Sequence, residues 1–100
     1  MIIDIRREDE WGMTGIIDGA KTITAFTKTG HLHQDFQRKF ASLALSKKSP
    51  IVLYCRTGNR TNKLGNALVS QLGFSNLSHL RHGITGWFED GLKSIPYIDQ

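Results

Sequence analysis

The residues with the clearest capacity for chemistry lie between positions 55 and 60. Cys55, the single cysteine of the chain, is followed closely by Arg56, Gly58 and Arg60. A thiolate is a strong nucleophile, and neighbouring cations favour the ionised form of a thiol and attract anionic substrates. Cys55 is therefore the candidate nucleophile, and the residues after it are candidates for binding an anion or an anionic sulfur.

The elements on either side of this loop would hold the thiol at a helix N-terminus. Ile51-Val52-Leu53-Tyr54 predicts a short buried strand, because the run is apolar or aromatic and rich in residues that favour strands. Leu64, Ala67, Leu68 and Leu72 then fall at helical spacing and predict a helix that begins near Thr61. The loop N–H groups and the helix N-terminus would face the sulfur, which suits a thiolate or an anion bonded to sulfur.

The rest of the chain alternates between short apolar runs and helical patterns. Further strands are predicted at 1–5, 21–24 and 76–80, and further helices at 6–10, 33–45 and 83–88. In the 33–45 helix, the apolar face consists of Phe36, Phe40, Leu43 and Ala44. Trp11 is expected to point into the core. Gly12 and Gly15 are expected to end the short helix that begins at Arg6. Strands separated by helices predict an α/β fold with right-handed crossovers and a mainly parallel sheet.

Asp4 interrupts the first predicted strand near its carboxyl end, at the same edge of the sheet as Cys55, where ligands bind in such sheets. It is either a solvated edge residue or the partner of a buried arginine, and we favour the second because a buried acid needs a partner. Arg60 is the candidate partner. Whether Arg60 pairs with Asp4 and shapes the loop, or acts on the substrate, stays open, and Arg56 is the better candidate for substrate contact.

Composition restricts the classes of partner. A chain of 100 residues predicts one domain, and the single cysteine forms no internal disulfide. With no apolar run near the ~20 residues of a membrane span and no signal-peptide pattern at the start, we expect a cytoplasmic protein without membrane contact. The net charge of +4 favours small anionic substrates, while the scattered basic residues argue against nucleic acid.

No motif predicts a metal or a cofactor. His31 and His33 are close in sequence, but no cysteine or carboxylate cluster accompanies them, so we interpret them as solvated loop residues. The chain also lacks a glycine-rich dinucleotide fingerprint and a phosphate-binding loop. We therefore expect neither a metal nor a cofactor.

Four motifs resemble, in order along the chain, those of the rhodanese-like domain family of single-domain sulfurtransferases. The active-site loop of that family is very similar to Cys55-Arg56-Thr57-Gly58-Asn59-Arg60. The weaker resemblances are the acidic strand end Ile3-Asp4-Ile5-Arg6, the turn Gly15-Ile16-Ile17-Asp18-Gly19-Ala20, and Leu80-Arg81-His82-Gly83-Ile84 followed by Trp87. The turn has Ile16 and Asp18 where the family usually has His and Pro, and His82 replaces a glycine. The resemblance implies one rhodanese-like domain over 1–100, a three-layer sandwich whose sheet has four to five strands flanked by helices.

The resemblance also implies sulfur transfer. Cys55 would take sulfane sulfur from thiosulfate or a related small anionic donor, carry it as a persulfide, and pass it to cyanide, a thiol or a protein acceptor in a ping-pong cycle. Inward-pointing loop N–H groups would solvate the outer sulfur, and guanidinium groups would hold the anion of the donor. The expected catalytic residue is Cys55, supported by Asp4 and Thr61, and the expected substrate-binding residues are Arg56, Thr57, Gly58, Asn59 and Arg60.

Two other functions use a similar loop. A persulfide carrier or protein-binding module with incidental turnover needs the same residues as the enzyme. A cysteine phosphatase or arsenate reductase needs five residues between cysteine and arginine to surround a tetrahedral oxyanion. Here four residues separate Cys55 from Arg60, and Thr61 follows, so the spacing argues against phosphate chemistry.

Overall fold

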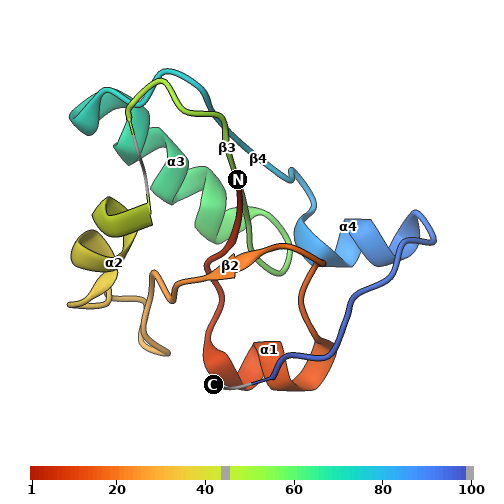
Figure 1. The fold of residues 1–100 in the computed structure, drawn as a ribbon. Helices are drawn as coiled ribbons and strands as arrows, with labels where there is room; N and C mark the ends of the chain where they lie inside the picture. Colours follow the sequence, from red (N-terminus) through yellow and green to blue (C-terminus); the bar gives the residue numbers. More distant parts are fainter. Residues whose placement is uncertain (44–45, 99–100) are drawn as a thin grey trace.

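Four short parallel strands form one sheet in the computed structural model of the protein, which describes residues 1–43 and 46–98 (Figure 1). Their order in the sheet is β2-β1-β3-β4. All three strand pairings are parallel, as expected from the alternation of strands and helices along the chain. The strands are β1 (Ile2–Asp4), β2 (Lys21–Thr22), β3 (Ile51–Tyr54) and β4 (Leu77–His79).

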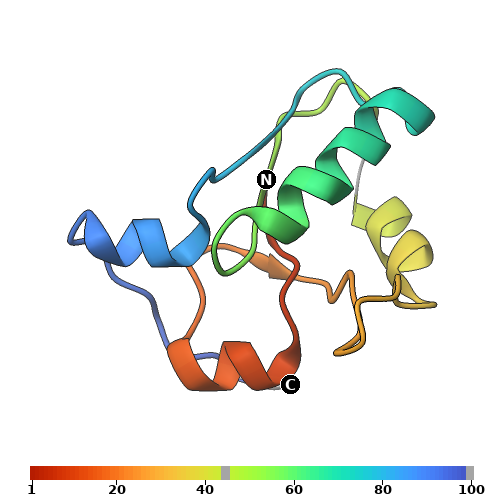
Figure 2. The ribbon, with the colours of Figure 1, turned by 180° about the vertical axis from the view of Figure 1, so that it is seen from behind.

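Helices on both sides of the sheet make the expected three-layer sandwich. Figures 1 and 2 show α2 and α3 on one side of the strands, α4 on the other, and α1 beyond the carboxyl ends of β1 and β3. The larger apolar core lies between the sheet and the α2–α3 pair, and a smaller one lies on the side of α4. The helices are α1 (Glu8–Thr14), α2 (Phe36–Leu43), α3 (Asn59–Leu72) and α4 (Gly83–Glu89).

The first helix differs from its prediction at both ends. It begins at Glu8, continues through Gly12, and ends at Thr14, followed by Gly15 with a positive φ of 75°. A glycine inside a helix costs only about 1 kcal/mol, and the burial of Trp11 between its neighbours outweighs that cost. The prediction that Gly12 would break the helix is therefore wrong.

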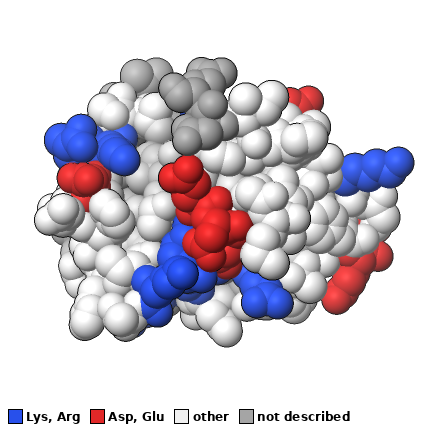
Figure 3. Space-filling view, turned by 90° about the horizontal axis from the view of Figure 1, so that it is seen from below, with Lys and Arg blue, Asp and Glu red and all other residues white. Residues whose placement is uncertain are grey.

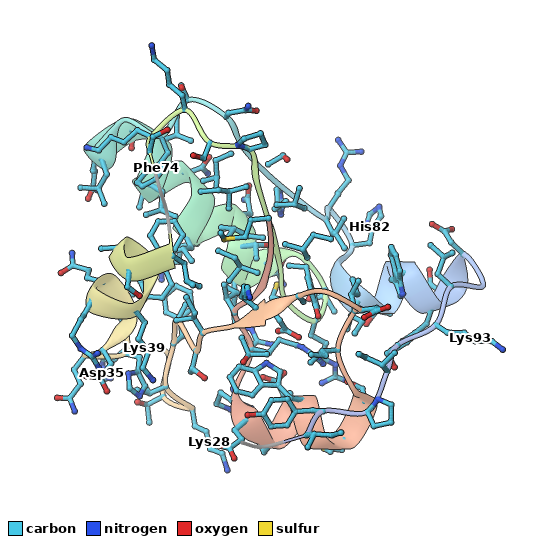
Figure 4. The ribbon with its side chains drawn as sticks, in the orientation of Figure 1. Lys28, Asp35, Lys39, Phe74, His82 and Lys93 are labelled. Carbon is cyan, nitrogen blue, oxygen red and sulfur yellow. The ribbon has the colours of Figure 1, made fainter. Side chains whose placement is uncertain are left out.

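Helix α2 carries the apolar face that the spacing predicts, whereas α3 buries Leu64 and Leu68 but leaves Leu72 41% exposed. Phe36 and Phe40 stack with ring centroids 5.3 Å apart, and Leu43 packs against the same core, while Ala44 lies outside the described residues. Helix α3 ends at Gly73 in a left-handed conformation, as expected for a C-terminal glycine. Phe74 then folds back onto Phe40 at the end of α3 (Figure 4).

The segment after α4 returns across α1. Ile16 and Ile95 exchange two backbone hydrogen bonds of 2.9 and 2.8 Å, and the rings of Trp11 and Tyr97 lie 5.1 Å apart. This segment therefore packs against the face of α1 that carries Trp11. Within the described part of the chain, no helix has the length and apolar character needed to cross a bilayer.

Candidate active site

Cys55 lies at the point where the central strand gives way to a helix. It directly follows Tyr54, the last residue of β3, and its side chain is only 1% exposed. The N–H of Gly58 donates to its sulfur at 3.2 Å, and α3 begins one residue later, at Asn59. The predicted placement of the thiol, at the carboxyl end of a central strand and before a helix that begins near Thr61, is confirmed.

Helix α4 fixes the orientation of the loop. The N–H groups of Ile84 and Thr85, in its first turn, donate to the carbonyls of Cys55 and Arg56 at 2.9 and 3.1 Å. The C=O and N–H of a trans peptide point in opposite directions, so the N–H groups of Arg56 and Thr57 point away from α4. The sulfur packs on that other side, in the core that α3 covers. These loop N–H groups therefore face the side of the sheet on which the Cys55 sulfur lies.

Two glycines allow this close packing. Gly58 has φ 102°, and a Cβ on it would lie 1.9 Å from the carbonyl oxygen of Arg81. Gly83 has φ 60°, and a Cβ there would lie 2.3 Å from the carbonyl oxygen of Arg56. No other residue type fits either position without moving backbone, so the loop and the start of α4 depend on each other.

Of the two roles left open for Arg60, the pairing with Asp4 is wrong. Asp4 is fully buried beside Arg6, whose Nη2 donates to it at 2.8 Å and whose Nε donates to both carboxylate oxygens. The same guanidinium donates to the carbonyl of Gly15 and the hydroxyl of Thr14. Asp4 pairs with Arg6 and not with Arg60 because Arg6 lies only two residues away, and the same guanidinium also joins β1 to the end of α1. A buried arginine does pair with Asp4, but it is not the arginine of the loop.

Arg60 pairs with Glu10 of α1 instead. Its two terminal nitrogens donate to the two carboxylate oxygens at 2.8 and 2.7 Å, which is a bidentate ion pair. Burial opposes ionisation of Glu10, but the hydrogen bonds from Arg60 and from the backbone of Arg7 outweigh it and lower the pKa of Glu10 from 4.5 to about 2. The same hydrogen bond raises the pKa of Arg60. Arg60 thus anchors the loop to α1, and Glu10 is a site residue that sequence reasoning missed.

The remaining loop side chains differ in exposure. Those of Arg56, Thr57 and Asn59 are exposed and accessible to a ligand, whereas Thr61 is fully buried. The Thr61 hydroxyl lies 3.6 Å from the Cys55 sulfur and 2.8 Å from Nδ1 of His79, the last residue of β4. His79 was not among the predicted site residues. Its position near the carboxyl end of a predicted strand indicated that it would lie at the same sheet edge as Cys55, but not which side chain it would bond.

A basic cavity of about 290 Å³ adjoins the end of the loop. Acidic and basic side chains lie side by side on the face that carries α1 (Figure 3), and Lys28 lies on the loop beside that helix (Figure 4). Within the described ranges, no three His, Cys, Asp or Glu side chains are grouped to hold a metal ion. The residues that line the cavity are Arg7, Phe26, Thr27, Lys28, Gly30, Asn59, Arg60 and Lys63.

The chain is similar in sequence to two known proteins and similar in fold to a solved structure. The "Rhodanese domain-containing protein CG4456" of Drosophila melanogaster is 34% identical over 76% of this chain and 70% of its own. The "Adenylyltransferase and sulfurtransferase UBA4" of Meyerozyma guilliermondii is 25% identical over 97% of this chain, which spans only 22% of that relative. The solution structure of the "Polysulfide-sulfur Transferase Homodimer" of Wolinella succinogenes superposes with a TM-score of 0.72 and 25% identity, covering 97% of this chain and 66% of that one.

The family match covers most of the sequence and includes the loop, α3 and α4. Residues 1–90 match the rhodanese-like domain. Together with the four-stranded parallel sheet and the cysteine loop at its carboxyl edge, this match shows that the chain belongs to the rhodanese-like domain family.

Proposed function

We propose that the protein is a sulfurtransferase that carries sulfane sulfur on Cys55 as a persulfide. The observation that carries the proposal is the geometry of the thiol, with the Gly58 N–H 3.2 Å from the sulfur and the α3 N-terminus beginning at the next residue. Membership of the rhodanese-like family supports it, as do two relatives whose names describe sulfur transfer. Helix N-termini and convergent N–H groups stabilise anions, and both the thiolate and the persulfide are anions.

Thiosulfate is the proposed donor, with a related anionic sulfane such as polysulfide as the other member of the class. The Cys55 thiolate attacks the outer sulfur of thiosulfate, a new S–S bond forms, and sulfite leaves with the electron pair of the broken S–S bond. The product, Cys55–S–S⁻, has its outer sulfur among the loop N–H groups. A thiophilic acceptor, either cyanide or a thiol, then removes that sulfur and restores the thiolate.

The charges around the loop favour an anionic donor. The cavity beside the loop has four cationic side chains, of which Arg60 and Arg7 are paired with Glu10. Among the described residues, neither Lys28 nor Lys63 forms an ion pair with an acidic side chain. Arg56 is exposed at the loop itself and is the candidate for direct contact with the donor. The pairing with Glu10 gives Arg60 an anchoring role in this proposal in place of a direct hold on the substrate.

One observation favours a protein acceptor, and with it the role of persulfide carrier. An apolar cavity of about 210 Å³ between α2 and α3 shares Phe26 and Lys63 with the basic cavity. An acceptor protein that rests on this surface would reach the loop from the same side. Phosphatase activity fits this site less well. The loop is one residue shorter than a loop that surrounds a tetrahedral oxyanion, and Gly58 is packed tightly against Arg81.

The intact mass of the purified protein tests the proposal. After incubation with thiosulfate, or separately with polysulfide, we expect each chain to gain one sulfur atom, which a thiol reductant then removes. Cys55→Ser should keep the circular dichroism spectrum of the fold and gain no sulfur. A wild-type protein that gains no sulfur from either donor contradicts the proposal.

Steady-state turnover separates the enzyme from the carrier. An enzyme that uses small acceptors produces thiocyanate from cyanide, or sulfide from excess thiol, over many cycles with thiosulfate. A carrier accepts one sulfur and then releases it slowly to small acceptors.

A further inference from the structure

A chain of hydrogen bonds links the Cys55 sulfur to a histidine on the neighbouring strand. The Thr61 hydroxyl lies 3.6 Å from Sγ of Cys55 and 2.8 Å from Nδ1 of His79. The same hydroxyl lies 3.2 Å from the carbonyl oxygen of Gly58, which already accepts from the N–H of Asn62 at 3.0 Å. Because Cys55 and Thr61 are 1% and 0% exposed, the first two members of this chain are shielded from water.

The Thr61 hydroxyl has a single proton, so its partners are coupled. When Nδ1 of His79 is unprotonated, the hydroxyl donates to it, and a hydroxyl lone pair is left to accept from the Cys55 thiol. When Nδ1 carries a proton, that N–H donates to the Thr61 oxygen, and the hydroxyl proton is directed to the sulfur or to the Gly58 carbonyl. The protonation of Nδ1 on His79 therefore decides whether the Thr61 hydroxyl can accept a hydrogen bond from the thiol or is free to donate one to the sulfur.

The surroundings of His79 let it exchange its proton with solvent. A cavity of about 130 Å³ on the side of α3 that faces β4 exposes part of the ring. None of the other residues that line it is titratable; they are Thr61, Asn62, Gly65, Asn66, Val69, Leu77 and Ser78.

The nearby charges lie elsewhere around the site. On the strand side, Arg81 and His82 follow β4 and are exposed, and His82 lies at the start of α4 (Figure 4). On the loop side, Arg60 is held by its ion pair with Glu10. His79 is thus the titratable group that the hydrogen bonds connect directly to the sulfur through Thr61.

We propose that His79 is a positioning residue and proton acceptor that acts on Cys55 through the Thr61 hydroxyl. The thiol proton passes to the Thr61 oxygen as the hydroxyl proton passes to Nδ1, which leaves a Cys55 thiolate, an intact hydroxyl and a His79 imidazolium. The hydroxyl then donates to the thiolate, and the imidazolium charge stabilises it. This inference rests on the proposed function, because it supplies the nucleophile of that reaction, but the ionisation itself needs no sulfur donor.

The rate of alkylation of Cys55 by iodoacetamide, measured across pH, tests the inference without sulfur transfer. His79→Asn keeps a hydrogen-bonding atom near the position of Nδ1 and removes the titration. We expect its alkylation rate at neutral pH to be about three- to tenfold below wild type, because a stabilising charge one hydrogen-bonded residue away is lost. The difference should disappear at alkaline pH, where solvent ionises the thiol.

Three further variants make the result specific. Thr61→Val breaks the link and should match His79→Asn, whereas Thr61→Ser keeps a hydroxyl and should retain most of the wild-type rate. His33→Asn is the matched control, since His33 is also partly exposed and accepts a hydrogen bond at Nδ1, from the N–H of Asp35 at 3.1 Å, away from the loop. It should leave the alkylation profile unchanged.

An alkylation profile of His79→Asn that superposes on wild type at every pH overturns the inference. An equal fall in the alkylation rate of Thr61→Ser and Thr61→Val also overturns it. Failure of the proposed function looks different. In that case thiosulfate and polysulfide add no sulfur to Cys55, while the alkylation rates of the variants still differ.

Discussion

At the scale of single residues, the ion pair of Arg60 with Glu10 shows how the loop is held at its far end. Both side chains are mostly buried, with exposed fractions of 24% and 14%, and their two hydrogen bonds join residues 50 positions apart. The near end of the loop is held by α4, through the carbonyls of Cys55 and Arg56. The loop is therefore shaped from both ends before any donor binds, which lowers the ordering cost of binding.

The ion pair predicts a loss of stability in acid. The pKa of Glu10 is lowered in the folded protein from 4.5 to about 2, so its contribution is complete above the unfolded value and is lost as pH falls from about 4.5 to about 2. We expect this group to contribute up to about 3 kcal/mol to the free energy of unfolding over that range. Urea unfolding at a series of pH values should show a smaller acid-induced loss in Glu10→Gln, and equal losses in both proteins would contradict the prediction.

A double-mutant cycle tests which acid partners Arg60. Arg60→Gln and Glu10→Gln should each lower the free energy of unfolding. The double variant should lose less of that free energy than the sum of the two single losses, with a coupling energy of about 1–3 kcal/mol. Asp4→Asn combined with Arg60→Gln is the control pair. Their effects should add, because Asp4 is bonded to Arg6. Coupling between Asp4 and Arg60 in thermal or urea unfolding would contradict the arrangement described here.

At the scale of elements, two glycines with similar backbones allow a matched test of loop packing. Gly58 and Gly91 both have positive φ, 102° and 82°, but a Cβ on Gly58 would meet the Arg81 carbonyl at 1.9 Å, whereas one on Gly91 would meet nothing within 4 Å. Gly91→Ala should lower the free energy of unfolding by about 1 kcal/mol, from backbone strain alone. Gly58→Ala should cost several times more and should also slow sulfur loading of Cys55. Equal changes in melting temperature would show that the turn between β4 and α4 does not press on the loop.

The strand–loop–helix unit around Cys55 was predictable because its signals are local. The apolar run before Cys55, the glycine within the loop and the helical spacing after it all fall within about two dozen consecutive residues. The bonds of Arg60 to Glu10 and of Thr61 to His79 were not predictable, because they join different elements, 50 and 18 positions apart. Composition and spacing do not show which of several carboxylates an arginine meets in space.

The pairing of Asp4 was missed for another reason. Its partner, Arg6, lies only two positions along the chain. Residues i and i+2 share one face of a strand, but β1 ends at Asp4, and the backbone turn that follows brings the Arg6 guanidinium back to the carboxylate. Neither the turn nor the burial of Arg6 had a signal in the sequence.

At the scale of the whole molecule, the net charge of +4 matters through its distribution. Lys28 and Lys63 line the cavity beside the loop, whereas Lys93 lies beyond α4, far from Lys28 (Figure 4). A dianionic donor such as thiosulfate should be drawn to the loop side by this field, and the attraction should weaken over the ~10 Å screening length of 0.1 M salt. The uneven charge distribution therefore predicts that kcat/KM for an anionic donor depends on ionic strength, and that replacing a lysine beside the loop matters more than replacing one far from it.

We expect kcat/KM for thiosulfate to fall as salt is raised, mainly through a higher KM. Lys28→Gln and Lys63→Gln should each lower kcat/KM by about two- to fivefold at low ionic strength and flatten its salt dependence. Lys93→Gln makes the same change in net charge on the other side of the molecule and should behave as wild type. Arg56→Ala should raise the donor KM more than Arg56→Lys, because lysine keeps the charge but not the planar fork. If Lys93→Gln lowers kcat/KM as much as Lys28→Gln, net charge alone governs donor use and the cavity beside the loop has no special part in it.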